Sequence, residues 1–352
     1  LEGKVDGWTS APPAAPAAPA APEIPAAPEI PEPAPAVAAA VAPEVSAADP
    51  QSSIDAMLGA ERVVVRLGGG ARSAGPEILE FLDLVDGVAV VSPLLSGVIP
   101  YSDPRNMSLG GSKGSLSGNF AMDEADLLVA VGTRFVCQSD SSRTGYPKVE
   151  QVININTDVQ AAMHYNHTIA LVGDAAKTLG ELNRQLKARG KKVPQGSSPW
   201  FQQCSEKLQQ WKTLKAQRYE NPAVYDEMWK EKVLTYPGSI KTATDWARAH
   251  DAVAFFDAGD VQGCAMQVVE DEKLGQTFSD SGASYMGYAV SSLLASAMAS
   301  QPFYGLAISG DGSFTMNPQI LIDGVHHGVH GCIVVLDNRR MGAISGLQIA
   351  QY

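Results

Sequence analysis

From residue 60 onward, the hydrophobic positions of this 352-residue chain follow two alternating patterns. Short apolar runs, often β-branched, are typical of buried strands, whereas apolar residues recurring every three or four positions are typical of helices. In the first half these patterns predict strands at 62–67, 88–91, 127–131, 152–155 and 169–172. They predict helices at 75–85 and from Asp174, as the N-cap, to about Arg189. Residues 92–120, rich in Gly, Ser and Pro, are expected to form a loop.

The same alternation returns after Tyr236. It predicts strands at 252–257, 304–309 and 332–336, and helices at 240–250, 261–270, 286–300 and 318–326. Buried strands that alternate with helices favour parallel sheets covered on both faces. We therefore expect an α/β protein with two doubly wound parallel-sheet domains, at 51–190 and 236–352, the second with a sheet still incomplete at Tyr352.

The segment between these domains, 191–235, has a different pattern. Its large apolar residues stand among Lys, Gln and Glu; they are Trp200, Leu208, Trp211, Leu214, Met228 and Trp229. This pattern predicts two amphipathic helices that break near Asn221-Pro222. Such an aromatic stripe packs on a core more often than it binds a ligand, so we interpret the segment as a helical connector lying on both domains.

The first fifty residues have a different composition from the rest. Residues 11–50 contain 17 Ala and 12 Pro and no aromatic residue, so they cannot bury enough apolar surface to fold. We expect residues 1–50 to be a disordered or extended Ala/Pro-rich linker. It would connect this chain to an upstream domain that the chain as given lacks, or tether it to a partner; a plain disordered tail is the alternative. Residues 1–50 carry seven acids and one Lys, a net charge of −6, which is half of the total of −12.

Composition excludes several classes of function. A pI of about 4.9 argues against a general nucleic-acid binder and a polybasic membrane anchor. No apolar run is long enough to span a membrane, and the start has no secretory-signal pattern. Four cysteines without a C-x-x-C pair fit a reducing cytoplasm.

Two polar motifs follow neighbouring predicted strands. The strand 304–309 leads into Gly310-Asp311-Gly312-Ser313, and Asp337-Asn338 follows the strand 332–336, with twenty-four residues between Gly312 and Asp337. Ligands of open α/β sheets bind at such carboxyl ends of strands. Glycine lets a phosphate approach the backbone, and carboxylate and amide oxygens suit Mg²⁺. The pattern indicates a Mg²⁺–diphosphate clamp.

The wording of these motifs, GDGSFTMNPQ and CIVVLDNRRMG, resembles the acetohydroxyacid synthase superfamily of thiamine-diphosphate enzymes. The resemblance implies that thiamine diphosphate binds at Gly310, Gly312, Ser313 and Met341. It implies that Mg²⁺ is held by Asp311, Asn338 and the backbone carbonyl of Arg340. The usual Asn-Asn doublet has Asp337 as its first member here, but the implied metal ligand is the second.

Two further stretches extend the resemblance. SYMGYAV at 284–290 is similar to the segment that bends the cofactor, which implies Met286 beneath the bend and the Ser284 carbonyl facing the aminopyrimidine. DAGDVQGCAM at 257–266 implies diphosphate contacts at Gly259 and Asp260. An acid beside a diphosphate is unfavourable unless it turns away or binds the metal, so Gly259 is the better candidate.

The first half, with RLGGGARSAG, LLVAVGTRF, VININTD and LVGDAAKTLGEL, resembles the superfamily's central domain, and the resemblance covers about 55–352. In some members this domain holds FAD or ADP, for which Gly68–Gly70 and Arg134 are the candidates. We favour tight turns in a domain without a nucleotide. A nicotinamide or flavin oxidoreductase would need a G-x-G-x-x-G spacing that Gly68–Gly70 lacks.

The resemblance also implies what a complete active site needs. Family members carry an activating glutamate on a pyrimidine-binding domain, which does not precede residue 51. We expect that a partner chain or a missing domain supplies it, in an oligomer, and that this chain alone turns over slowly. The implied substrate is a small carbonyl compound, either a 2-oxo acid or the cyclic diketone opened by the similar trihydroxycyclohexane-1,2-dione hydrolase. A non-catalytic subunit is the other alternative.

Other reactive side chains have simpler interpretations. His326 and His330 have a spacing that can chelate zinc, but solvated histidines are favoured because glycines would fray the helix. His164 and His167 are expected at the surface. Cys264 and Cys332, near the predicted site, are expected to be buried, inert thiols. Ser313 lacks the G-x-S-x-G context of a hydrolase nucleophile.

Overall fold

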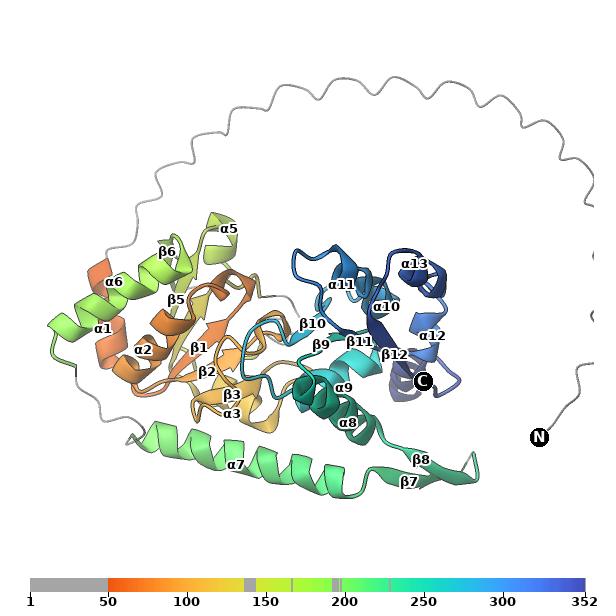
Figure 1. Cartoon of the computed structure of the whole chain (residues 1–352). Helices are drawn as coiled ribbons and strands as arrows, with labels where there is room; N and C mark the ends of the chain where they lie inside the picture. Colours follow the sequence, from red (N-terminus) through yellow and green to blue (C-terminus); the bar gives the residue numbers. More distant parts are fainter. Residues whose placement is uncertain are drawn as a thin grey trace, which may run out of the picture. The chain divides into compact units, whose positions relative to one another are not determined.

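The computed structural model describes residues 50–135, 144–165, 167–191, 196, 198–227 and 229–351 (Figure 1). The predicted Ala/Pro-rich linker lies outside these residues, apart from Pro50. Two parallel sheets and one antiparallel hairpin make up the strands. The predicted α/β class with two parallel sheets is therefore confirmed, whereas the domain boundaries stay predictions.

The first sheet has six parallel strands in the order β3-β2-β1-β4-β5-β6. All five predicted strands are present within a residue or two of their expected bounds. The strands are β1 Val63–Leu67, β2 Val88–Val91, β3 Asn106–Leu109, β4 Leu127–Val131, β5 Gln151–Asn156 and β6 Thr168–Val172.

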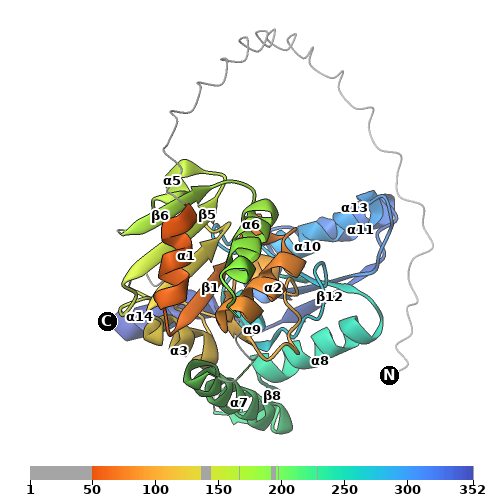
Figure 2. The same ribbon diagram turned by 90° about the vertical axis from the view of Figure 1, so that its left-hand side faces the viewer.

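Helices cover both faces of this sheet, as Figures 1 and 2 show. Val63, Val65 and Leu67 of β1 pack in one cluster with residues of α2 and α6, while Val64 packs in another with residues of α3 and α7. Successive side chains of a strand point to opposite faces, which explains this division. The helices are α1 Pro50–Gly59, α2 Gly75–Val85, α3 Leu116–Glu124, α5 Val159–Ala162, α6 Ala175–Ala188 and α7 Pro199–Glu220.

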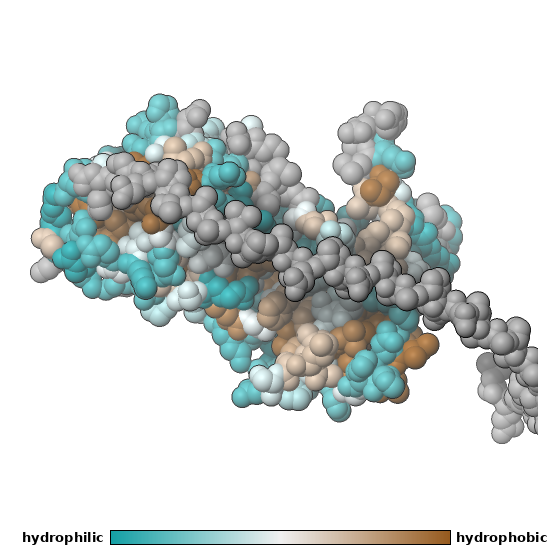
Figure 3. Space-filling view, turned by 90° about the horizontal axis from the view of Figure 1, so that it is seen from above, coloured by the Kyte–Doolittle hydropathy of each residue, from teal (hydrophilic) through white to brown (hydrophobic). Residues whose placement is uncertain are grey.

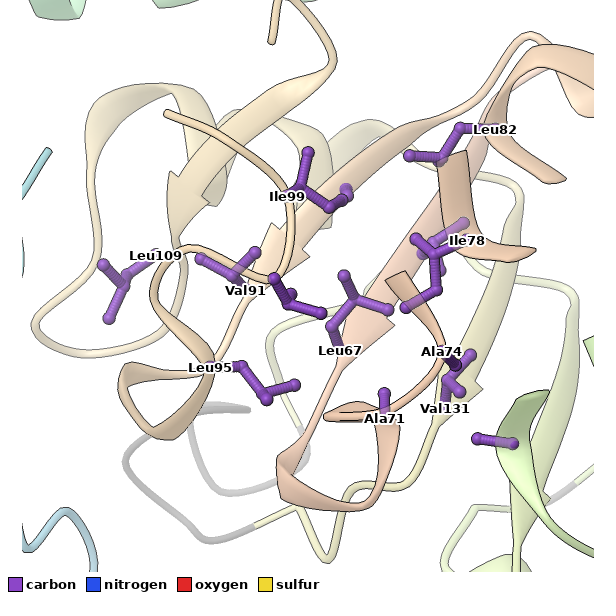
Figure 4. Packing of buried hydrophobic residues seen from close by; sticks show 14 of the residues in the cluster. Leu67, Ala71, Ala74, Ile78, Leu82, Val91, Leu95, Ile99, Leu109 and Val131 are labelled. Atoms are coloured by element: carbon purple, nitrogen blue, oxygen red, sulfur yellow. The ribbon is translucent and has the colours of Figure 1, made fainter. Parts of the chain in front are cut away.

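Figure 4 shows part of the first of these clusters, in which Ile78 of α2 lies near Leu67 of β1. The glycines after β1 approach the end of β4 closely: a Cβ on Gly68 would lie 2.4 Å from the Thr133 Cα. This close approach leaves no room for a side chain at position 68, so it requires glycine. The predicted cap is also confirmed, because an oxygen of Asp174 accepts a hydrogen bond from the Lys177 amide at 3.0 Å.

The loop expected at 92–120 is wrong in part, since it contains β3 and most of α3. The Ser115 hydroxyl caps α3 by accepting from the Gly118 amide at 2.8 Å. A Cβ on Gly118 would lie 2.1 Å from the Leu109 carbonyl oxygen, so this helix needs glycine to pack on β3. The glycine and serine that suggested a loop are thus needed here to pack the helix closely on the strand and to cap it.

Of the two helices predicted for the connector, the structure contains only the first, α7. In α7, Trp200, Cys204, Leu208 and Trp211 are buried at helical spacing, and the Trp200 indole donates to the Val63 carbonyl at 3.1 Å. The second expected helix is wrong. After Pro222 the chain forms an antiparallel hairpin of β7 Ala223–Asp226 and β8 Glu231–Leu234. Proline ends the helix, and β-branched and aromatic residues favour strands. Of the remaining stripe residues, Leu214 is exposed, Trp229 is half-buried beneath the Arg339 guanidinium, and Met228 lies outside the described residues.

The second sheet has four parallel strands in the order β10-β9-β11-β12. Its faces are also both covered: Phe256 and Ile308 pack with α8 and α9, while Phe255 and Ala307 pack with α10. Its elements are α8 Tyr236–Ala249, β9 Val253–Phe256, α9 Asp260–Val268, β10 Thr277–Ser279, α10 Tyr288–Ser292, α11 Leu294–Met298, β11 Gly305–Gly310, α12 Asp311–Phe314, α13 Ile320–His326, β12 Gly331–Leu336 and α14 Gly342–Gln351.

The helix expected at 286–300 is present over Tyr288–Met298, but it is interrupted at Leu293 and divides there into α10 and α11. The Ser291 and Ser292 hydroxyls donate to the carbonyls of Gly287 and Tyr288, each at 2.7 Å. Such bonds from serine back to the helix bend it. The strand β10 was not predicted from the sequence.

The segment after α9, residues 270–272, is bonded to a loop of the first sheet and to α7. The Tyr101 amide donates to the Asp271 carbonyl at 2.9 Å, and the Ser102 hydroxyl donates to Glu272 at 2.7 Å. Buried Lys215 of α7 pairs with Glu270 at 2.9 Å, and burial lowers the pKa of that lysine. In the described part of the chain, no helix is long and apolar enough to cross a membrane.

Candidate cofactor site

The predicted site residues meet at the carboxyl ends of three parallel strands. Gly259 follows β9, Asp311 follows β11 and Asn338 follows β12. Adjacent parallel strands end at one edge of a sheet, so their following loops form one cleft. The cleft has a volume of about 230 Å³.

All eleven residues predicted from the sequence line this cleft: Gly259, Asp260, Ser284, Met286, Gly310, Asp311, Gly312, Ser313, Asn338, Arg340 and Met341. Their ligand-binding roles stay predictions. The cleft also has lining residues that sequence reasoning missed, namely Tyr236, Ala258, Val261, Gly342, Ala343 and Ile344. Tyr236 begins α8, some 75 residues before the Gly-Asp-Gly motif, and no local pattern connects the two.

Asp311 and Asn338 present oxygen atoms that fit a hard cation. Within the described residues, the Asp311 carboxylate has no hydrogen-bond or ion-pair partner. The Asn338 Oδ1 accepts from the Arg340 amide at 3.0 Å and keeps a second lone pair, while its Nδ2 donates to the Tyr236 hydroxyl at 3.1 Å. These bonds orient the carboxamide with its oxygen available to a ligand.

No group of three or more His, Cys, Asp or Glu residues able to hold a metal occurs in the described residues. One carboxylate, one amide and one carbonyl cannot complete an octahedron by themselves. Mg²⁺ is commonly held by one or two carboxylates together with substrate phosphates and water. The donor set therefore fits a metal that arrives with a diphosphate.

Asp260 points into the cleft and does not turn away from it. A Cβ on Gly342 would lie 2.9 Å from the Asp260 Oδ2 and 2.7 Å from the Asn338 Nδ2, so these side chains face the same small volume. Burial raises the pKa of Tyr236, and the charges of Asp260 and Asp311 raise it further. Two carboxylates in one cleft favour a bound cation.

Two methionines narrow the cleft above Gly312. A Cβ on Gly312 would lie 2.9 Å from the Met341 Sδ and 3.6 Å from the Met286 Cε. The backbone at Met286 is held by Asp257, whose Oδ1 accepts from the Gly287 amide at 2.8 Å. Ser284 and Gly259 adopt positive φ values of 55° and 82°. Both backbone conformations turn the chain sharply beside the cleft.

The other candidates lie elsewhere. Helix α13 ends at His326, so His326 and His330 do not share a helix face. Cys332 is exposed and starts β12, at the edge of the sheet opposite the cleft, so its expected burial near the site is wrong. Cys264 is half-buried in α9, and burial raises the pKa of its thiol to about 11. His167 is exposed as expected, whereas His164 stacks on Phe135 with ring centroids 4.8 Å apart.

Comparison with known protein families agrees with this geometry. Residues 51–182 match the central domain of thiamine pyrophosphate enzymes, and residues 257–352 match their C-terminal domain, which binds thiamine pyrophosphate. The chain belongs to the thiamine pyrophosphate enzyme family. All eleven predicted site residues, from Gly259 to Met341, fall within the second match.

The curated relatives of this chain include proteins of two kinds. A 3D-(3,5/4)-trihydroxycyclohexane-1,2-dione hydrolase of Listeria monocytogenes is 28% identical over 82% of this chain and 47% of its own length. The acetolactate synthase large subunit of Haemophilus influenzae is 24% identical over 85% of this chain and 50% of its own length. The chain thus spans about half the length of the curated relatives it matches.

Proposed function

We propose that this chain supplies the diphosphate- and Mg²⁺-binding half of the active site of an enzyme that forms or breaks a carbon–carbon bond next to a carbonyl group. The observation that carries the proposal is the convergence of all eleven predicted residues on one cleft at the ends of β9, β11 and β12. Thiamine diphosphate would supply the electron sink for that chemistry. A lyase or transferase of the acetolactate-synthase type is the leading assignment.

The residues of this chain have distinct roles in the proposal. Asp311, Asn338 and the Arg340 carbonyl would hold Mg²⁺, with the diphosphate over Gly310, Gly312 and Ser313. The Met286 and Met341 side chains would exclude water from the cofactor above Gly312, since both approach that glycine closely. Gly259, Asp260 and Ser284 would complete the wall.

The proposal includes a partner that carries the activating glutamate, on another chain or another domain, in an oligomer. Exposed apolar side chains of the second half support it. Met298, Leu321, Ile322 and Val325 are 57–84% exposed, and Figure 3 shows hydrophobic surface gathered on that half of the molecule. Apolar patches of this kind are typical of protein interfaces. A cytoplasmic location goes with the proposal, because Cys204, Cys264 and Cys332 are free thiols.

The test is titration calorimetry of thiamine diphosphate with and without Mg²⁺. We expect binding that requires Mg²⁺ and is lost in Asp311→Ala. Asp323→Ala is the matched control, because Asp323 is an exposed acid on α13 outside the cleft. Binding that persists without Mg²⁺ or in Asp311→Ala would refute the metal clamp, and no binding by folded protein would refute the cofactor site.

Two other functions remain as alternatives. A cyclic 1,2-diketone hydrolase is favoured by the Listeria relative, and adding that diketone to the assembled enzyme would reveal it as ring opening. A non-catalytic subunit is favoured by Asp337 in place of the usual Asn. Such a subunit would stabilise its partner without binding thiamine diphosphate, so the same calorimetry separates it from the leading proposal.

A further inference from the structure

A second pocket adjoins the cofactor cleft and shares Gly259 and Ser284 with it. Its volume is about 190 Å³, which is enough for a small organic molecule of a few carbon atoms. The loops after β2 and β3 form one wall, and α9 with the segment before α10 forms the other. The lining residues include Lys113, Gly259, Gly263 and Ser284.

Lys113 alone carries a charge among the described residues that line this pocket. Its ammonium group makes no ion pair or hydrogen bond with any other described residue. The acid Asp280 is not an ion-pair partner of Lys113; its Oδ2 accepts a hydrogen bond from the Tyr285 amide at 3.0 Å. A cation in a pocket wall without acids attracts an anionic ligand group.

The backbone around Lys113 is held from both sides. The Gln267 Nε2 donates to the carbonyls of Lys113 and Gly114 at 3.3 and 3.4 Å, and the Gly111 amide donates to the Asn119 Oδ1 at 2.8 Å. These bonds anchor the loop to α9 on one side and to α3 on the other. The lysine side chain therefore starts from a defined position at the pocket.

Gly263 accounts for the path of the lysine side chain. It lies inside α9, where glycine weakens a helix. A Cβ at this position would lie 2.7 Å from the Lys113 Cδ and 2.9 Å from its Nζ. The bare backbone thus gives the lysine room to lie across the helix and bring its charge to the pocket.

We propose that Lys113 binds the carboxylate of a small 2-oxo acid in this pocket, with the carbonyl end of the acid directed past Ser284 toward the cofactor cleft. The inference rests on the proposed function, which places the reacting centre in that cleft. It also selects between the two substrate classes left open above, because a cyclic diketone has no carboxylate for Lys113 to bind.

The test is site-resolved lysine acetylation of the full chain, with thiamine diphosphate and Mg²⁺ present and their binding measured on the same sample. The probes are oxamate, an unreactive analogue of a 2-oxo acid, and its uncharged ethyl ester. We expect oxamate to slow acetylation of Lys113 but not of the exposed Lys232, and the ester to protect neither. Equal protection by the ester, or no protection by oxamate, overturns the inference.

Two variants give an independent readout. Lys113→Met keeps the aliphatic stem and removes the charge, so we expect oxamate to bind about tenfold more weakly while thiamine diphosphate binds as before. Gly263→Ala keeps the charge and favours the helix, but its Cβ displaces the lysine, so we expect the same loss in a protein that is at least as helical.

The outcomes separate this inference from the proposed function. If the parent protein does not bind thiamine diphosphate, the proposed function fails. If it does, and Lys113→Met binds oxamate unchanged, only the role of Lys113 fails. If Lys113→Met loses thiamine diphosphate, the lysine serves the diphosphate, and the assignment to a substrate carboxylate is wrong.

Discussion

Asp257 is a buried carboxylate that joins three parts of the second sheet at the cleft. It lies at the end of β9 and is fully buried. Its Oδ1 accepts from the amides of Ala258 and Gly287 at 3.0 and 2.8 Å, and its Oδ2 accepts from the Ser309 hydroxyl at 2.7 Å. Asp257 therefore ties β9 to β11 and to the turn that carries Met286.

Replacing Asp257 with alanine leaves two buried backbone donors, at Ala258 and Gly287, without an acceptor. The Ser309 hydroxyl has an alternative, because the Gly310 carbonyl lies 3.2 Å away. A stranded buried donor costs about 1–3 kcal/mol, so the two cost about 2–6 kcal/mol. Removing a buried charge offsets part of this, and we expect Asp257→Ala to lower the free energy of unfolding by about 2–4 kcal/mol.

Asp257→Asn is the matched control. Its Oδ1 can accept both backbone bonds, and its Nδ2 can donate to the Ser309 oxygen once that hydroxyl turns to Gly310. We expect a loss below about 1 kcal/mol. The assay is equilibrium unfolding in urea followed by tryptophan fluorescence, with thiamine diphosphate binding measured on the same samples.

The two variants should also differ in cofactor binding. Asp257→Ala frees the turn behind Met286, so we expect weaker binding of thiamine diphosphate, while Asp257→Asn keeps it. If the alanine variant unfolds within about 0.5 kcal/mol of the parent, or if asparagine costs as much as alanine, the reasoning about stranded donors is wrong.

Two further predictions concern glycines and thiols. Gly118→Ala should destabilise the protein by about 1–3 kcal/mol, because its Cβ would lie 2.1 Å from the Leu109 carbonyl oxygen. Gly180→Ala in α6, where a Cβ meets nothing within 4 Å, should stabilise it by up to about 1 kcal/mol, and thermal unfolding of both variants checks the contrast. Burial raises the pKa of the Cys264 thiol from 9.0 to about 11, so less of it is thiolate at pH 8. Alkylation there should be about a hundredfold slower than for an unperturbed thiol and should accelerate up to pH 11; mass spectrometry that finds Cys264 as reactive as exposed Cys332 would contradict this.

The sequence by itself determined the strands and the positions of the cofactor motifs. Runs such as Val88–Val91 and Leu127–Val131 are buried on both faces, and uninterrupted apolar residues are the pattern of such strands. The Gly-Asp-Gly motif and Asn338 were found because each follows a strand directly. Parallel strands bring their carboxyl ends to one edge of the sheet, so motifs that directly follow two adjacent strands lie close together in space.

Only the tertiary structure decided the elements and contacts that depend on distant residues. The segment around Gly118 has a loop-like composition, yet it is helical because close packing of this helix on β3 requires glycine there. The hairpin β7–β8 replaces a helix that periodicity alone favoured. Tyr236 reaches the cleft and Lys113 reaches its neighbouring pocket from separate elements, while buried Asp257 supports the turn at Met286, through contacts that no local pattern encodes. Local patterns report what a segment buries, whereas the sheet's topology decides which segments meet.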